Sequence, residues 1–397
     1  MKALRPCLII LLSLLAFLPA SCRPVADIPR EESWRPPPSS RPVGEAAELL
    51  DDLDVKTLEK AVNLSIGYYE RNGAQKSYCF QDTCRSAAEM IAGLREFLRL
   101  ARSDLPVAEK ETALREKFVF LRVPEDMLIT GYYEPVIEGS LKRTERFRYP
   151  IYRPPPDTVV VRLDRFNGRY GNERLVGRLQ KGEVIPQPSR REIDAGGALQ
   201  GKGLEIAWVD DPVALFSLHI QGSGKLRLPD GRLVHVTYAQ SNGRPFRGLT
   251  LMMAEKGLLK EGERSYEQMK KVLRECSPAE RQELMNYNER YIFFRIVPEG
   301  PLGALGLPLI AGRSVATDLG FYPPGALAVI KTRKPVFDRE GNITSWQSIN
   351  RFVLNHDTGA AIKGPGRMDL FCGTGTEAER TAGAMKEKGE LYFLFKK

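Results

Sequence analysis

Apolar residues recur at helical spacing in the first third of the chain. One such set lies on a single helix face: Leu58, Ala61, Val62 and Ile66. Residues 87–100 repeat the pattern, and residues 104–121 form a third amphipathic stretch. We therefore expect the region from about 46 to 123 to form helices that cap one domain.

After Pro124 the pattern changes to short runs rich in β-branched and aromatic residues. Five runs are expected to be strands: 129–133, 159–162, 204–208, 215–220 and 234–238. Turn sequences such as Pro229-Asp230-Gly231 separate them, as in an antiparallel barrel or sandwich. Helical spacing returns over 265–287, with Pro278 near a helix start, and a second β-rich block covers 291–395. Together the segments predict a mainly β protein with helices.

The N-terminus has the pattern of an export signal. Lys2 and Arg5 precede an apolar run over 8–18, and this run is shorter than the roughly 20 residues that a membrane span needs. The signal ends in Leu18-Pro19-Ala20-Ser21-Cys22, which is similar to a lipobox except at Pro19, where an aliphatic residue is usual. We expect residues 1–22 to be a lipoprotein signal and Cys22 to become the lipidated N-terminus. Plain signal cleavage is the alternative.

Residues 23–45 are rich in proline and charge, which predicts a semi-rigid tether. With Arg23 directly after the lipidated cysteine, we expect sorting to the periplasmic face of the outer membrane. The net charge of +9 favours an anionic partner. Export and the absence of basic runs interleaved with aromatics argue against nucleic acid, and polymers of the cell wall that bear carboxylates fit better.

Four cysteines remain in the mature chain: Cys79, Cys84, Cys276 and Cys372. No CxxC pair or histidine cluster accompanies them, so we expect neither a metal nor another cofactor. An exported protein can form disulfides, and Cys79 with Cys84 could close a small loop. Four cysteines allow three pairings, and the sequence does not choose among them.

Three aspartates near the C-terminus are candidates for catalysis: Asp318, Asp357 and Asp369. Asp369 lies among apolar residues of a predicted strand, and burial raises the pKa of a carboxyl group, as a general acid requires. Because a free Asp titrates near ~3.9, a useful acid at neutral pH needs a pKa raised by roughly 2–3 units. Taken singly, the spacing of each aspartate favours a turn or strand-end residue that accepts backbone hydrogen bonds.

The segment from Asp357 to Phe371, DTGAAIKGPGRMDLF, resembles the signature of the three-aspartate (3D) domain in the family of membrane-bound lytic murein transglycosylase A. Six further segments resemble hallmarks of the same family in the same order: Thr130-Gly-Tyr-Tyr-Glu-Pro135, Gly203-Leu-Glu-Ile-Ala-Trp208, His219-Ile-Gln-Gly-Ser-Gly224, Asn286-Tyr-Asn288, Phe293-Phe-Arg295 and Gly303-Ala-Leu-Gly-Leu-Pro-Leu309. The resemblance covers roughly 130–395, and collinear matches are more specific than one short motif.

This resemblance implies a fold and a domain organisation. A helix-capped double-psi β-barrel would be formed by residues 46–134 and 300–397. A second β-barrel domain would be inserted over 135–299, and a groove between the two would hold a glycan strand.

The resemblance also implies a reaction, which is the non-hydrolytic cleavage of the β-1,4 bond between N-acetylmuramic acid and N-acetylglucosamine in peptidoglycan. Asp369 would act first as the acid and then as the base, and the product would be a 1,6-anhydro end. Residues expected to bind substrate are Asp357, Gln221, Ser223, Thr130, Tyr132 and Tyr133, with Asp318 in a supporting role. We expect one of the two tyrosines to line the groove and the other to pack inward.

Two other classes of protein are alternatives. A non-catalytic wall-binding lipoprotein would share the fold, and fold alone does not decide activity. An aspartic protease would explain Asp357-Thr358-Gly359-Ala360, but the chain has one copy and only 40 residues follow Asp357. Both a transglycosylase and a wall-binding lipoprotein could form complexes with enzymes of cell-wall synthesis.

Overall fold

The computed structural model describes residues 51–123, 127–170, 173–260 and 265–397. The predicted signal peptide, the lipidation site at Cys22 and the tether lie outside this range. Within the described ranges, no helix combines the length and the apolar character needed to cross a membrane.

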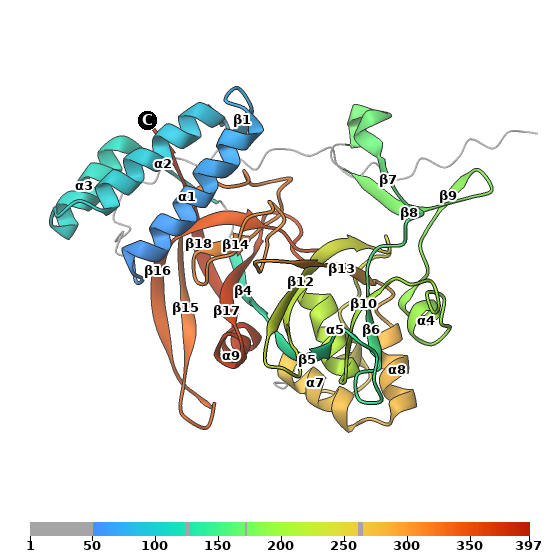
Figure 1. The fold of residues 1–397 in the computed structure, drawn as a ribbon. Helices are drawn as coiled ribbons and strands as arrows, with labels where there is room; N and C mark the ends of the chain where they lie inside the picture. The colour runs from blue at the N-terminus through green and yellow to red at the C-terminus, as the bar shows by residue number, and fades with distance from the viewer. Residues whose placement is uncertain (1–50, 124–126, 171–172, 261–264) are drawn as a thin grey trace, which may run out of the picture. The chain divides into compact units, whose positions relative to one another are not determined.

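Six strands close into a barrel at the C-terminal end of the chain (Figure 1). They are β4 (Met127–Glu134), β14 (Ser314–Ala316), β15 (Leu327–Phe337), β16 (Ile343–Asp357), β17 (Arg367–Thr374) and β18 (Lys386–Lys396). Their order is β15-β16-β14-β17-β4-β18, and β18 pairs back with β15. The strand β3 (Phe118–Arg122) pairs with β18 outside this ring. The predicted barrel is therefore confirmed, and β4 joins it from far earlier in the sequence.

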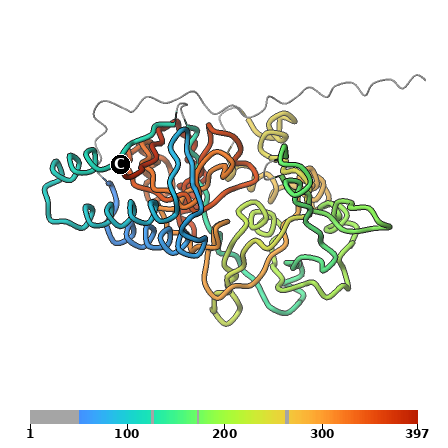
Figure 2. Tube along the Cα trace, turned by 90° about the horizontal axis from the view of Figure 1, so that it is seen from above, coloured from blue at the N-terminus to red at the C-terminus, as the bar shows by residue number. Residues whose placement is uncertain are grey.

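Three helices cover the barrel: α1 (Val55–Asn72), α2 (Ala87–Ala101) and α3 (Val107–Lys117). Figures 1 and 2 show α1 and α2 side by side against the barrel strands, and they share one hydrophobic core with them. The helix face predicted around Leu58 is buried, as expected. The third prediction is wrong over 118–121, because these residues leave the helix and form β3. Pairing with β18 overrides the local helical spacing there.

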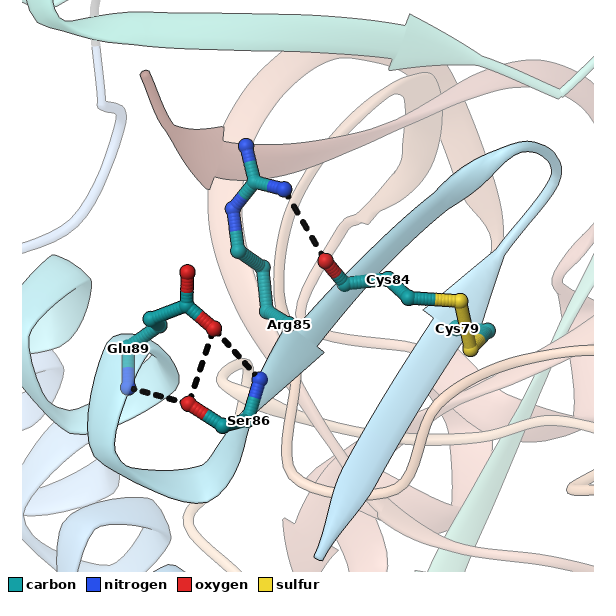
Figure 3. The surroundings of a disulfide bond; sticks show 5 residues. All are labelled: Cys79, Cys84, Arg85, Ser86 and Glu89. Carbon is teal, nitrogen blue, oxygen red and sulfur yellow. Dashed lines mark hydrogen bonds between the residues drawn. A yellow bond between two sulfur atoms is a disulfide. The ribbon is translucent and has the colours of Figure 1, made fainter. Parts of the chain in front are cut away.

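A short hairpin between α1 and α2 carries the disulfide (Figure 3). Its strands are β1 (Ser77–Phe80) and β2 (Thr83–Ser86), in which Cys79 and Cys84 are directly paired and bonded. Of the pairings left open by the sequence, this is the one present, and Cys276 and Cys372 are free thiols. At the end of the hairpin Ser86 caps α2 in a capping box with Glu89.

The part of the chain between β4 and β14 forms a second sheet with its own core. Its strands, in spatial order, are β13 (Ile292–Val297), β12 (Leu233–Ser241), β11 (Ser223–Arg227), β5 (Val136–Ser140), β10 (Glu205–Val209) and β6 (Tyr149–Tyr152). In the described residues the two edge strands share no backbone pairing. They instead approach each other through aromatic side chains such as Tyr152 and Tyr291, whose rings lie 6.4 Å apart.

Smaller elements complete this region. A three-stranded sheet comprises β7 (Thr158–Arg162), β8 (Arg174–Gln180) and β9 (Glu183–Ile185), with the short helices η1 (Leu163–Arg165) and η2 (Gly168–Tyr170) between β7 and β8. The α-helices are α4 (Arg190–Asp194), α5 (Pro212–Gln221), α6 (Leu249–Glu255), α7 (Tyr266–Glu275) and α8 (Pro278–Asn286). The remaining helix, α9 (Thr376–Ala384), lies between β17 and β18.

The strand predicted over 215–220 is wrong, because this run lies inside α5. Asp211 caps the helix by accepting a hydrogen bond from the Val213 N–H at 2.8 Å, and Pro212 occupies its first turn. Gly222 ends it in a left-handed conformation, with φ of 78°. A short, mostly apolar run does not distinguish a buried helix from a buried strand, and the Asp-Pro start and the glycine end are the signals that do.

Two buried arginines tie the start of α1 to the barrel. The Arg313 side chain is fully buried and donates to Asp51 at 2.7 and 2.8 Å, to the Asp54 carbonyl at 2.9 Å and to the Phe352 carbonyl at 2.9 Å. Arg351 donates to Asp52 at 2.7 Å. The first described residues are therefore held by charged hydrogen bonds inside the protein.

Candidate active site

The aspartates of the 3D-type segment meet on the outer face of the barrel wall. Along β17, Met368 and Leu370 point into the barrel core, so the side chain of Asp369 lies on the opposite face. Asp369 pairs with Ala316 on one side, and Ala316 pairs in turn with Asp357 at the end of β16. The two aspartates therefore share a face, two strands apart.

The Asp369 side chain is only partly exposed to solvent, and protein groups surround its carboxyl. On its other side it pairs with Thr130 of β4, whose hydroxyl donates a hydrogen bond to its carboxyl. Burial raises the pKa of Asp369 to about 6, the Arg367 guanidinium lowers it, and the charge of Asp357 raises it. With this pKa, roughly a tenth of the group is protonated at pH 7, compared with about a thousandth for a free Asp, and this favours a role as general acid.

Asp357 is held differently. One of its oxygens accepts hydrogen bonds from the N–H groups of Ala304 and Thr358, each at 2.8 Å, and the other accepts one from the Tyr132 hydroxyl at 3.0 Å. Burial raises the pKa of Asp357 to about 6, although these donors act to lower it. Three donors stabilise a carboxylate at Asp357 against one at Asp369.

The structure divides the tyrosine pair. Tyr132 is partly exposed, bonds to Asp357, and lies against Phe371 with a ring separation of 5.2 Å. Burial raises the pKa of Tyr132 well above its usual value, and the charge of Asp357 adds to this shift. Tyr133 is 3% exposed, packs against α9 and donates to Glu379 at 2.5 Å. Tyr133 is thus the tyrosine of the pair that packs inward, because alternation along β4 turns its ring away from Tyr132.

Gln221 and Ser223 come from the second sheet region. Gln221 ends α5, and its side-chain oxygen accepts the Tyr133 N–H at 3.3 Å, which connects this region to β4. Ser223 begins β11, is buried and pairs with Thr237. In the described part of the chain neither side chain forms a hydrogen bond with Asp357 or Asp369. Their predicted contact with sugar stays a prediction.

Asp318 lies outside the row of paired residues. Its carboxylate accepts hydrogen bonds from the N–H groups of Gly320, at 3.0 Å, and Gly364, at 2.9 Å. It thereby joins the turn after β14 to the loop between β16 and β17, the loop that separates the two candidate aspartates. Its supporting role in the reaction stays a prediction.

Two buried groups beside the site were not singled out from the sequence. His356 lies between the hydroxyls of Ser65, at 2.9 Å, and Ser314, at 3.0 Å, and burial lowers its pKa to about 3. It precedes Asp357 and fixes that end of β16 to α1. Glu134, at the end of β4, accepts from Thr374 at 2.7 Å and pairs with Lys225 at 3.2 Å. The partners of His356 and Glu134 lie far from them in the sequence, so only the folded structure shows what these two residues contact.

Across the described ranges, no three His, Cys, Asp or Glu side chains are grouped so that they could hold a metal ion. A second buried histidine, His219, lies in the second sheet region. Its Nδ1 is 3.2 Å from the guanidinium of Arg190. Burial and the nearby guanidinium lower the pKa of His219 well below its ordinary value, so it is a neutral structural group.

Comparison with protein families and known proteins gives a consistent result. Residues 128–295 match the MltA specific insert domain, and residues 313–395 match the 3D domain. Membrane-bound lytic murein transglycosylase A of Escherichia coli K12 is 32% identical over 267 residues, which are 67% of this chain and 64% of that protein. The chain thus aligns with slightly less than two thirds of the length of that relative.

Solved structures agree over a larger share. The crystal structure of a membrane-bound lytic murein transglycosylase from Agrobacterium tumefaciens superposes with a TM-score of 0.72 at 31% identity, covering 87% of this chain and 93% of that one. That of MltA from Neisseria gonorrhoeae superposes with a TM-score of 0.64 at 29% identity, covering 86% of each chain.

Proposed function

We propose, from the premise that this chain belongs to the family of membrane-bound lytic murein transglycosylase A, that it is a lytic transglycosylase of peptidoglycan. It cleaves the β-1,4 bond between N-acetylmuramic acid and N-acetylglucosamine and leaves a 1,6-anhydro end. Asp369 is the acid and then the base. The names of the relatives supply the substrate class, and the geometry of the aspartates supports the mechanism.

The observation that carries this proposal is the contrast between the two carboxyl groups. Most glycosidases use two carboxylates, one as the acid and one as base or nucleophile. Here both oxygens of Asp357 already accept hydrogen bonds, two of them from backbone N–H groups. Asp357 is therefore poorly suited to take a proton from water, whereas Asp369 has one hydroxyl partner and a partly exposed surface. A mechanism with one catalytic carboxyl fits this pair.

In the proposed reaction, protonated Asp369 donates to the glycosidic oxygen as the bond from C1 to that oxygen breaks. The N-acetylglucosamine side leaves with the new hydroxyl, and positive charge develops at C1. The C6 hydroxyl of the same muramic residue then attacks C1 and gives its proton to the Asp369 carboxylate. The carboxyl is regenerated and no water is consumed. An intramolecular nucleophile has a high effective concentration, so no second base is needed to hold a water.

The direct test is a digest of purified peptidoglycan, with the products identified by mass spectrometry. Products about 18 Da lighter than reducing-end muropeptides, the mass of one water, would establish the 1,6-anhydro ends. Reducing ends would identify a hydrolase and overturn the one-carboxyl mechanism. Binding without any cleavage would instead favour the wall-binding lipoprotein.

The pH dependence of kcat/KM tests the assignment of the proton. Because the pKa of Asp369 is raised to about 6, activity should fall as pH rises above that value and the acid loses its proton. The charge of Asp357 contributes to this rise, so Asp357→Asn should move the alkaline limb to lower pH. Initial rates of muropeptide release between pH 4 and 9, for the wild type and for Asp357→Asn, measure the position of the alkaline limb and its shift. An alkaline limb that Asp357→Asn leaves in place would contradict the coupling.

The location is also a proposal. Relatives are named membrane-bound, and we infer an anchor in the outer membrane through lipidated Cys22, facing the periplasm. Replacement of Cys22 by Ala should move the protein from the membrane fraction to the soluble fraction of the envelope while its activity on isolated peptidoglycan persists. Unchanged fractionation would show that plain signal cleavage or another contact decides its location.

A further inference from the structure

The row of paired residues that holds the two aspartates continues beyond Thr130. Thr130 of β4 pairs with Asp369 of β17 on one side and with Lys386 of β18 on the other. Directly paired residues of neighbouring strands present their side chains to the same face of a sheet. The outer face of the barrel therefore carries a row of five residues, one on each of five neighbouring strands. In spatial order they are Asp357 on β16, Ala316 on β14, Asp369 on β17, Thr130 on β4 and Lys386 on β18, and Figure 1 labels these strands.

A second cation lies on this face, next to the acid. Arg367 is two residues before Asp369 on β17, so both side chains stand on the same side of the strand. The guanidinium is close enough to affect the ionisation of Asp369. Arg367 thus lies beside Asp369 along the strand, and Lys386 lies across the sheet on the side away from Asp357.

Neither cation forms a hydrogen bond through its side chain or an ion pair among the described residues. The Nε of Arg367 is enclosed by protein without a hydrogen bond, and no ion pair engages its guanidinium. Lys386 is exposed and likewise forms no ion pair in the described ranges. The buried arginines Arg313 and Arg351 differ, since each pairs with an aspartate. An enclosed donor without an acceptor is costly, and a bound acceptor would remove that cost.

The ligand chemistry follows from the charges and from the proposed substrate. A planar guanidinium with free donors matches a carboxylate, and an exposed ammonium adds a second positive charge. Muramic acid differs from N-acetylglucosamine by a lactyl arm. That arm ends in a free carboxylate in peptide-free strands and carries the carboxylates of the stem peptide in intact wall. A neutral glycan such as chitin has neither.

We propose that Arg367 and Lys386 bind a carboxylate carried on the lactyl arm of the muramic residue, and so select muramic glycans over neutral ones. This inference rests on the proposed function, because it names the part of that substrate that the same face recognises. Arg367 and Lys386 are specificity-determining residues in it, and Asp369 remains the catalytic group.

The test compares binding of three hexasaccharides to the full-length chain in an Asp369→Asn background, which prevents turnover. The probes are peptide-free alternating glycan, the same glycan with stem peptides, and chitohexaose. Isothermal titration calorimetry should show that Arg367→Gln lowers the affinity for the two anionic glycans by roughly tenfold, as expected for the loss of charge-assisted hydrogen bonds. Lys386→Gln should lower the affinity for the anionic glycans by about threefold. In both variants the affinity for chitohexaose should change by less than about twofold. Lys60→Gln, an exposed lysine on α1, is the matched control.

A loss confined to peptide-free glycan would assign the lactyl carboxylate, and a loss confined to peptide-bearing glycan would assign the stem peptide. Either result supports the proposal. Equal loss for chitohexaose would show that Arg367 and Lys386 only support the fold of the face, and no loss would remove them from recognition, so both outcomes overturn it. Since binding is measured without turnover, this result does not depend on whether the wild-type chain cleaves peptidoglycan, which the digest decides separately.

Discussion

Replacing Asp369 by Asn is expected to lower kcat for release of anhydro-muropeptides by about 10³-fold or more, because general acid catalysis contributes that order of rate enhancement and no second acid shares the role. The amide is nearly isosteric and can still accept the hydrogen bond from Thr130. Affinity for glycan should therefore persist. Mass spectrometry of the digest measures the first effect, and calorimetry with peptide-free glycan measures the second.

Asp230→Asn is a suitable control, because Asp230 is an exposed turn residue bonded only to Arg232. It should retain wild-type rates. If Asp369→Asn kept more than about a tenth of the activity, another group would have to supply the proton, and the assignment to this row of residues would fail. If it lost binding together with cleavage, the substitution would have disturbed the site and not only its chemistry.

The second large effect concerns stability. Arg313→Ala should lower the free energy of unfolding by about 3–5 kcal/mol, the range for breaking a buried ion pair. The substitution would remove the partner of Asp51 and leave the carbonyls of Asp54 and Phe352 without their donor. Burial already raises the pKa of Asp51, and the nearby Arg313 opposes this shift. Urea unfolding followed by circular dichroism gives the difference in free energy.

Arg99→Ala provides the comparison, because the pair of Arg99 with Glu96 lies at the surface. Such exposed pairs contribute about 0–1 kcal/mol. A loss at Arg313 no larger than the loss at Arg99 would show that the segment around Asp51 is not held by this arginine. A double substitution of Arg313 and Asp51 would separate their mutual interaction from the packing of each side chain.

Local pattern alone predicted much of the fold. The buried face of α1 around Leu58 follows from helical spacing, and β4 and β12 follow from runs of strand-forming residues. The apolar neighbours of Asp369 predicted a partly buried carboxyl with a raised pKa, and the structure has both features. These features depend on residues within one or two turns or along one strand, so periodicity carries the information. The same method failed over 215–220, where polar Ser217 and His219 alternate with apolar residues as in a strand although the run lies inside a helix.

The sequence by itself determined the mainly β character, the capping helices and, through motifs, the family with its candidate acid. Tertiary structure alone decided which groups surround that acid. Residues 130, 316, 357, 369 and 386 become neighbours only because the parallel pairing of β4 with β17, and the closure of the ring through β18, set their register. The roles of Tyr132 and Tyr133, the three donors to Asp357 and the unpaired Arg367 depend on that register. Contacts between segments far apart in sequence leave no period in the chain, so only the folded barrel reveals them.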